Sequence, residues 1–195
     1  MAATQLNDPP VRCGRPPRRD LHQVPARVRQ CGHARLLDVA YRPAESVSAC
    51  LLFHDWPDDT EAGVLIKRLP PAAPYQPGQF YLRELPCLLH VLRRAPAPLS
   101  VGVIGGYVWL GDQGQPGLGA RLQKELGGPV IGVAKTTFHG SPDAVEVLRG
   151  QSQKPLYVSA AAIDLAEAAR AIERMYGPHR IPTLLKRVDR LCRDG

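Results

Sequence analysis

The distribution of apolar and polar residues predicts three consecutive β-strands in the first third of the chain. Runs rich in β-branched and aliphatic residues cover 35–41, 46–53 and 62–69, and short segments bearing Pro, Asp or Glu separate them. Apolar runs bounded by turn residues are typical of strands. Because the connections are short, we expect these three strands to form an antiparallel meander.

A helix is predicted over 81–94, directly after the meander. Leucines recur there at spacings of three and four, which places them on one helical face: Leu82, Leu85, Leu88, Leu89 and Leu92. Pro86 has no backbone N–H to donate and is tolerated near the first turn of a helix. Glu84 is expected in that first turn, where the helix dipole favours a carboxylate.

Strands and helices alternate in the rest of the chain. The pattern predicts strands over 100–104, 129–134, 144–148 and 155–159 and helices over 117–126, 164–176 and 182–193. Such alternation favours parallel strand pairing. The expected fold class is therefore α/β, a ribonuclease H-like mixed sheet with helices on both faces.

Length and composition indicate one globular domain preceded by a basic arm. A chain of 195 residues holds one sizeable core. Residues 1–33 place arginines among prolines with little apolar periodicity, so we expect a loosely ordered arm there and the folded domain over 34–195. The arm either touches a phosphate backbone or is a solvated tail.

The chain carries 25 Lys and Arg against 18 Asp and Glu. This excess favours a polyanionic partner such as nucleic acid, although an arginine-rich genome would also produce it. The five cysteines are odd in number and show no CxxC spacing, which favours a reducing compartment. No apolar run reaches the roughly 18 residues of a membrane span, and the N-terminus lacks an apolar signal core, so we expect a cytoplasmic protein without membrane contact. We also expect a monomer.

The stretch SVGVIGGYVWL, residues 100–110, reads as a buried strand that ends at Gly105 and Gly106. In α/β proteins, ligands and metals bind at the carboxyl ends of such strands. That chemistry normally requires a side chain, which a glycine does not provide.

Four stretches in this order resemble the endonuclease V family of repair nucleases, which cut DNA near deoxyinosine. They are LLDVAY, PYQPGQFYLRELP, VIGVAK and HRIPTLLKRVDRL, and with their spacing the resemblance covers roughly residues 35–193. The segment GGYVWLG…PGLGARL looks like a divergent bacterial branch, because the family's His-Pro-Arg-rich stretch is missing. The resemblance implies a metal-dependent DNA repair endonuclease that hydrolyses a phosphodiester 3′ to deoxyinosine or another deaminated base.

The resemblance also implies a metal site for Mg²⁺, with Mn²⁺ as an alternative, formed by Asp38, Glu84 and Asp189. The residues themselves agree with this, since an isolated ionised Asp38 within an apolar strand would cost several kcal/mol to bury unless it faces a cation or solvent. Lys135 ends its strand as the family's lysine does and is expected to bind the scissile phosphate. His139 and His179 follow turn sequences and are interpreted as loop histidines.

Gly105 stands where the family has a further metal-binding aspartate. Loss of that carboxylate removes a full charge and two oxygen donors, which should weaken Mg²⁺ binding or misplace the attacking water. Asp112, in the following GDQG segment, is a candidate substitute. Two alternatives therefore stay open: a catalytically impaired nucleic-acid-binding member of the family, and a protein acting on inosine-containing RNA.

Tyr75 is expected to act as an aromatic wedge in the DNA base stack. Pro74 and Pro77 flank it and restrict its segment, and the resemblance places the wedge of the family here. Gly78, together with the backbone around GGYVW, is expected to line a pocket for the extruded hypoxanthine base.

Overall fold

The computed structural model describes residues 33–76, 78–96, 98–138 and 143–195, so the predicted arm lies almost wholly outside the described part. One seven-stranded sheet forms the centre of the molecule, in the order β3-β2-β1-β4-β7-β9-β8. Its strands are β1 (His33–Tyr41), β2 (Ser46–Phe53), β3 (Gly63–Leu69), β4 (Leu99–Gly105), β7 (Val130–Ala134), β8 (Ala144–Val147) and β9 (Leu156–Ala161).

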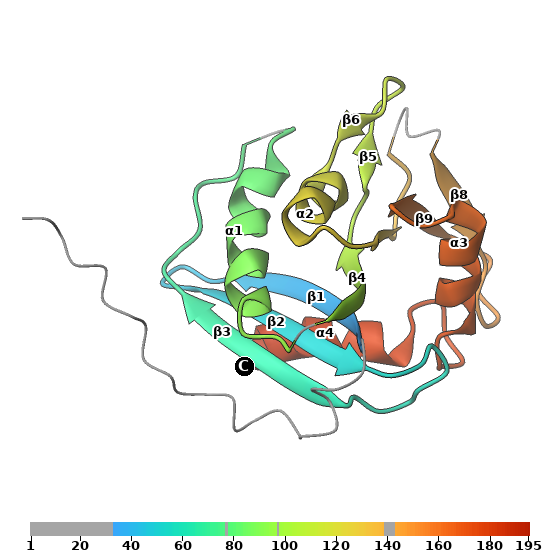
Figure 1. The fold of residues 1–195 in the computed structure, drawn as a ribbon, viewed down its shortest axis with the longest axis horizontal. Helices are drawn as coiled ribbons and strands as arrows, with labels where there is room; N and C mark the ends of the chain where they lie inside the picture. The colour runs from blue at the N-terminus through green and yellow to red at the C-terminus, as the bar shows by residue number, and fades with distance from the viewer. Residues whose placement is uncertain (1–32, 77, 97, 139–142) are drawn as a thin grey trace, which may run out of the picture.

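Helices cover both faces of this sheet, as predicted (Figure 1). One face packs against α1 (Phe80–Leu92) and α2 (Leu118–Leu126), and the other packs against α3 (Leu165–Arg174) and α4 (Thr183–Asp194). A short hairpin that the sequence pattern did not predict, β5 (Trp109–Leu110) and β6 (Gln115–Pro116), lies apart from the main sheet. Within the described part of the chain, no helix is long and apolar enough to cross a bilayer.

The antiparallel meander of the first three strands is confirmed. β1 pairs with β2 and β2 pairs with β3, both antiparallel. β2 is buried along its whole length because it lies between two strands and under helices on both faces. The meander therefore gives β1 a fixed partner on one side and leaves its other side for β4.

The second half of the sheet corrects the predicted parallel pairings in part. β1 with β4 and β4 with β7 are parallel, but β9 runs antiparallel to both of its neighbours, β7 and β8. Adjacent parallel strands need a crossover of about a dozen residues, usually a helix. The connections from β7 to β8 and from β8 to β9 are both shorter than that, and β8 and β9 form a hairpin.

The predicted leucine face of α1 is confirmed in part. Leu88 and Leu92 are buried with Cys87 and Val91, and Leu85 and Leu89 pack partly against the core, whereas Leu82 is 45% exposed. Pro86 lies inside the helix, and Glu84 lies in the second turn, not in the first. Glu84 continues the buried stripe at helical spacing, so core packing positions its carboxylate and the helix dipole has a smaller effect.

The chain that leaves β4 crosses directly over β7 at Gly132. A Cβ atom added to Gly132 would lie 2.6 Å from the carbonyl oxygen of Gly106, closer than side chains allow. Val108, fully buried beside it, donates its N–H to Ser159 Oγ at 2.9 Å and accepts from the N–H of Gly117. This crossing holds the turn after Gly105 against the sheet.

We predict that Gly132→Ala lowers the free energy of unfolding by about 1–3 kcal/mol, because the new methyl group overpacks the crossing. Gly102→Ala is the matched control, since its Cβ would meet only side-chain atoms at 3.7 Å or more. That control should leave stability unchanged or raise it by up to about 1 kcal/mol. Urea unfolding measures both, and equal stabilities would contradict the close approach at Gly132.

Candidate functional site

The parallel register of β1 and β4 aligns Asp38 with Gly105. Leu37 pairs with Ile104, so the next residue of each strand points to the opposite face, toward α4. Gly105 in turn pairs with Val133 of β7, one residue before that strand ends. The side chain of Asp38 and any side chain at position 105 therefore point to the same face of the sheet.

A small cavity of about 160 Å³ lies between this face and the helix α4. Asp38, Gly105, Lys135 and Asp189 contribute to its lining, together with apolar side chains of α4 and the segment before it. Asp189 is half-buried, and its carboxylate also accepts a 2.9 Å hydrogen bond from Arg193 one turn later. Three of the predicted site residues thus come together from β1, the end of β7 and α4.

Glu84 reaches the same place from the other side of the sheet. A second, more open cavity of about 450 Å³ is lined by both Asp38 and Glu84, with Gly105 and Lys135 between them. Glu84 is only 6% exposed, and its Oε2 has no hydrogen-bond partner among the described residues. The fourth predicted site residue is therefore joined to the other three.

Burial and mutual repulsion act on the carboxyl groups. Burial raises the pKa of Asp38 to about 6, and the nearby Asp189 adds to this rise. The N–H of Val39, which donates to Asp38 Oδ1 at 3.0 Å, and the charge of Lys135 oppose it. Burial, and after it the charge of Asp38, raises the pKa of Glu84 to about 8. Acidic groups gathered with so little positive charge bind a proton more readily than isolated ones.

The side chains fit a hard divalent cation, and Gly105 leaves room beside them. All the donors are carboxylate oxygens, which Mg²⁺ prefers. Glu84 lines the larger cavity, and its Oε2 is buried without a hydrogen-bond partner among the described residues. Among the described residues, however, no group of three or more His, Cys, Asp or Glu side chains is already arranged to hold a metal ion. A Cβ atom at Gly105 would meet nothing within 4 Å, so this position has room for a further carboxylate.

The remaining predicted site residues lie on the segments around this centre. Tyr75 is 60% exposed, on the segment that leads into α1, and Pro74 beside it is exposed too. Gly78 has a φ of +75°, a conformation that favours glycine. Pro77 and His139 lie outside the described residues.

Two other predicted positions lie away from the carboxylates. Asp112 is exposed in the turn between β5 and β6 and lines neither of the two cavities. His179 is an exposed loop residue whose carbonyl accepts a hydrogen bond from Arg149. Nothing in the placement of Asp112 supports its role as a substitute ligand.

The sequence reasoning missed two aromatic residues beside the carboxylates. Phe80 and Phe138 line the larger cavity together with Tyr107, and they are 42% and 50% exposed. The Tyr107 hydroxyl donates to the carbonyl of Thr136 and accepts from the N–H of Phe138, which fixes the loop after β7. A large exposed apolar residue next to a cavity is a signal for ligand binding, but sequence alone does not show the exposure.

The sequence also shows no sign of the role of Arg180, whose side chain holds the backbone of Lys135 in place. Its Nη2 group donates to the carbonyl oxygen of Lys135 and, at 2.6 Å, to that of Pro155. The guanidinium therefore ties the end of β7 to the start of β9. The residue lies in the HRIP stretch, where its charge gave no hint of a backbone contact.

Comparison with known proteins finds one family that is similar to this chain in sequence. Residues 26–190 match the sequence model of endonuclease V. Endonuclease V of Streptomyces coelicolor is 33% identical over 140 residues, which are 62% of this chain and 60% of that protein. The match thus spans less than two thirds of the length of that relative.

Solved structures agree with this match. The crystal structure of endonuclease V from Streptomyces avermitilis has a TM-score of 0.64 at 27% identity, over 84% of this chain and 80% of that one. Ciona intestinalis endonuclease V, crystallised with a 24mer DNA containing an inosine followed by a ribo-adenosine, has the same fold with a TM-score of 0.70. It is 18% identical, over 85% of each chain.

We predict that Gly105→Asp folds with a free energy of unfolding within about 1 kcal/mol of the unmodified chain, because the position is open and exposed. Gly106→Asp should lose about 1–3 kcal/mol, since Gly106 has a φ of +104°, which strains any residue with a Cβ. Urea denaturation without divalent ions tests the pair. A large loss shared by the uncharged Gly105→Asn would show that this position has no room for a side chain, whereas a loss confined to Gly105→Asp would measure repulsion from the neighbouring carboxylates.

Proposed function

Because the chain belongs to the endonuclease V family, we propose that it is a DNA repair nuclease that acts at deaminated bases. It binds DNA at deoxyinosine and hydrolyses a phosphodiester on the 3′ side of that base, with Mg²⁺ or Mn²⁺ as the metal. The observation that carries this proposal is the convergence of Asp38, Glu84, Asp189 and Lys135 around two adjoining cavities.

The proposed roles follow from charge and position. Asp38, Glu84 and Asp189 would hold the metal ion, and its charge would offset the repulsion that raises the pKa of Asp38 and Glu84. Bound Mg²⁺ supplies a Lewis acid for the phosphate oxygens and lowers the pKa of water. Lys135, exposed at the end of β7, binds the scissile phosphate and orients it against the carboxylates.

The larger cavity is suited to receive a base taken out of the DNA stack. Its walls combine Phe80, Tyr107 and Phe138 with the bare backbone of Gly105 and Gly106. Aromatic faces bind bases by stacking, and glycine backbone allows a flat ring to approach closely. Tyr75 is exposed on the segment that leads to Phe80, so it can fill the gap that an extruded base leaves.

Gly105 favours a second candidate function, binding of lesion DNA with impaired cleavage. The aromatic side chains of the cavity and the exposed tyrosine do not depend on this residue, whereas the metal site lacks the oxygen donors that a carboxylate there would provide. Mg²⁺ retains several bound waters in proteins, so three carboxylates can still bind it. Binding of deoxyinosine DNA should therefore be preserved better than its cleavage.

We predict that Gly105→Asp raises the turnover of an inosine-containing duplex by at least about 10²-fold, because a misplacement of about 1 Å at the reacting centre has that effect. DNA affinity should change less than about threefold, since the aromatic contacts are unaltered. Single-turnover cleavage in Mg²⁺ and in Mn²⁺ measures the rate. A matched inosine-containing RNA, tested in parallel, reports the choice of substrate.

Gly105→Asn is the control for this experiment, because it adds nearly the same volume without charge and should not raise turnover. Asp38→Asn in the Gly105→Asp background should abolish the gain. If the unmodified chain cuts as fast as Gly105→Asp, another group already supplies the ligand. Asp112→Asn would then have to abolish cutting for Asp112 to be that group.

We also predict that Tyr75→Ala reduces the preference for deoxyinosine over ordinary DNA by about tenfold or more, since a stacking contact contributes roughly 1–3 kcal/mol per base. Tyr75→Phe retains the ring and should keep the preference. Competition binding with inosine-containing and unmodified duplexes measures it. Full lesion preference in Tyr75→Ala would rule out the wedge.

A further inference from the structure

We propose that the protein carries a second nucleotide-binding pocket at the end of the sheet opposite the carboxylates, where β1, β4 and β7 begin. A cavity of about 570 Å³ opens there, within the usual range for small-molecule sites. Ala34 and Val101, near the starts of β1 and β4, form part of its floor, and Pro129 precedes β7. Asp38 and Lys135 lie toward the other ends of these strands, so the two sites are separate.

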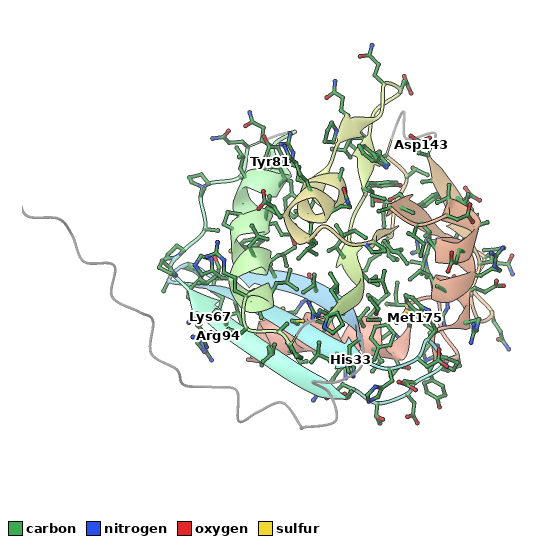
Figure 2. The ribbon with its side chains drawn as sticks, in the orientation of Figure 1. His33, Lys67, Tyr81, Arg94, Asp143 and Met175 are labelled. Carbon is green, nitrogen blue, oxygen red and sulfur yellow. The ribbon has the colours of Figure 1, made fainter. Side chains whose placement is uncertain are left out.

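One wall of this pocket is aromatic and held in place by hydrogen bonds. His54 and Trp56 follow β2, and the Trp56 ring packs edge-on against Phe53 with centroids 5.3 Å apart. Asp58 accepts from the N–H groups of His54 and Asp55, which closes the turn that carries the tryptophan. The His54 ring also lies 4.6 Å from that of His33, labelled in Figure 2. The rings are thus positioned before a ligand arrives.

A second part of the pocket lining is cationic. Arg170 and Arg174 lie one turn apart on α3 and line the pocket from the same side of the helix. Both are exposed, and neither guanidinium has a hydrogen bond or an ion pair within the described part of the chain. Two unpaired guanidinium groups side by side form a fork for a phosphate.

The combination selects a planar base that bears a phosphate. The phosphate binds the two arginines, the base stacks on Trp56, and Glu167 on the same helix can accept from a base N–H group. Inorganic phosphate would use only the arginines, and an uncharged aromatic molecule would use only the rings. A nucleotide is the class of ligand that satisfies both walls.

Backbone strain at Ala162, which lines the pocket, also supports a ligand site there. Ala162, which lines the pocket between β9 and α3, has a φ of +58°, and among the described residues other than glycine it alone has a positive φ. Such conformations persist where surrounding structure requires them, and they gather at ligand sites. The pocket does not depend on the proposed nuclease activity, because it shares no residue with the cavities around Asp38.

The test is a titration of the full chain with deoxyadenosine 5′-monophosphate, followed by NMR of the indole N–H groups. The chain has two tryptophans, and Trp109 lies outside the pocket with its Nε1 group bonded to the carbonyl of Ala160. The Trp56 resonance should shift in a saturable way while that of Trp109 stays in place. Inorganic phosphate should not reproduce the shift. A short single-stranded oligonucleotide that binds more tightly would identify a strand as the natural source of the nucleotide.

Variants separate specific binding from general attraction. Arg170→Gln with Arg174→Gln should weaken binding at least about tenfold, as expected for lost charged hydrogen bonds. Arg93→Gln, at the exposed end of α1, removes the same kind of charge elsewhere and should leave binding unchanged. Trp56→Phe should retain binding and Trp56→Leu should lose it. The absence of a saturable Trp56 shift, or equal affinity in the double arginine variant, would overturn the proposal.

Discussion

The in-register parallel pairing of β1, β4 and β7 is the constraint on which the rest of the structure depends. Leu36 pairs with Val103, and Val103 pairs with Ile131, so the three strands present their side chains to the same faces at the same level. A shift by one residue would turn every side chain of a strand to the other face. The level of Asp38, Gly105 and Lys135 follows from this register, and the crossing of the chain over Gly132 fixes it.

The carboxylates at this edge are held against their electrostatic preference. Packing of α1 buries Glu84, and packing of α4 brings Asp189 to Asp38, so groups of like charge lie together where solvation is poor. A cation relieves this repulsion, and otherwise the groups bind protons. Glycine at 105 lowers the negative charge of the cluster by one compared with aspartate. The cluster is therefore buried as a metal site is, but it has fewer oxygen donors than it would have with aspartate at 105. For this reason we expect cleavage of DNA to be impaired more than binding of DNA.

The two edges of the sheet differ in the way they offer positive charge and aromatic surface. At the carboxylate edge, exposed phenylalanines lie beside acidic groups and the lysines Lys135 and Lys186. At the other edge, Trp56 lines a pocket with two arginines of α3 that have no ion pair in the described part of the chain. Each edge combines a stacking surface with charge, but in different proportions. The first has the charges that suit a cation, and the second has the charges that suit an anion.

The sequence by itself determined the strands, the helices and the meander, because these depend on periodicity and turn residues over short distances. It also identified Asp38, Glu84, Lys135 and Asp189, through motifs that the fold then brought together. Only the tertiary structure decided the direction of β9, the exposure of Leu82 on α1 and the exposure of Phe80 and Phe138. These depend on contacts between segments far apart in the chain, and several faces of an apolar helix are compatible with the same sequence. The open space at Gly105 belongs to this second class, since it is set by the neighbouring strands and not by the glycine itself.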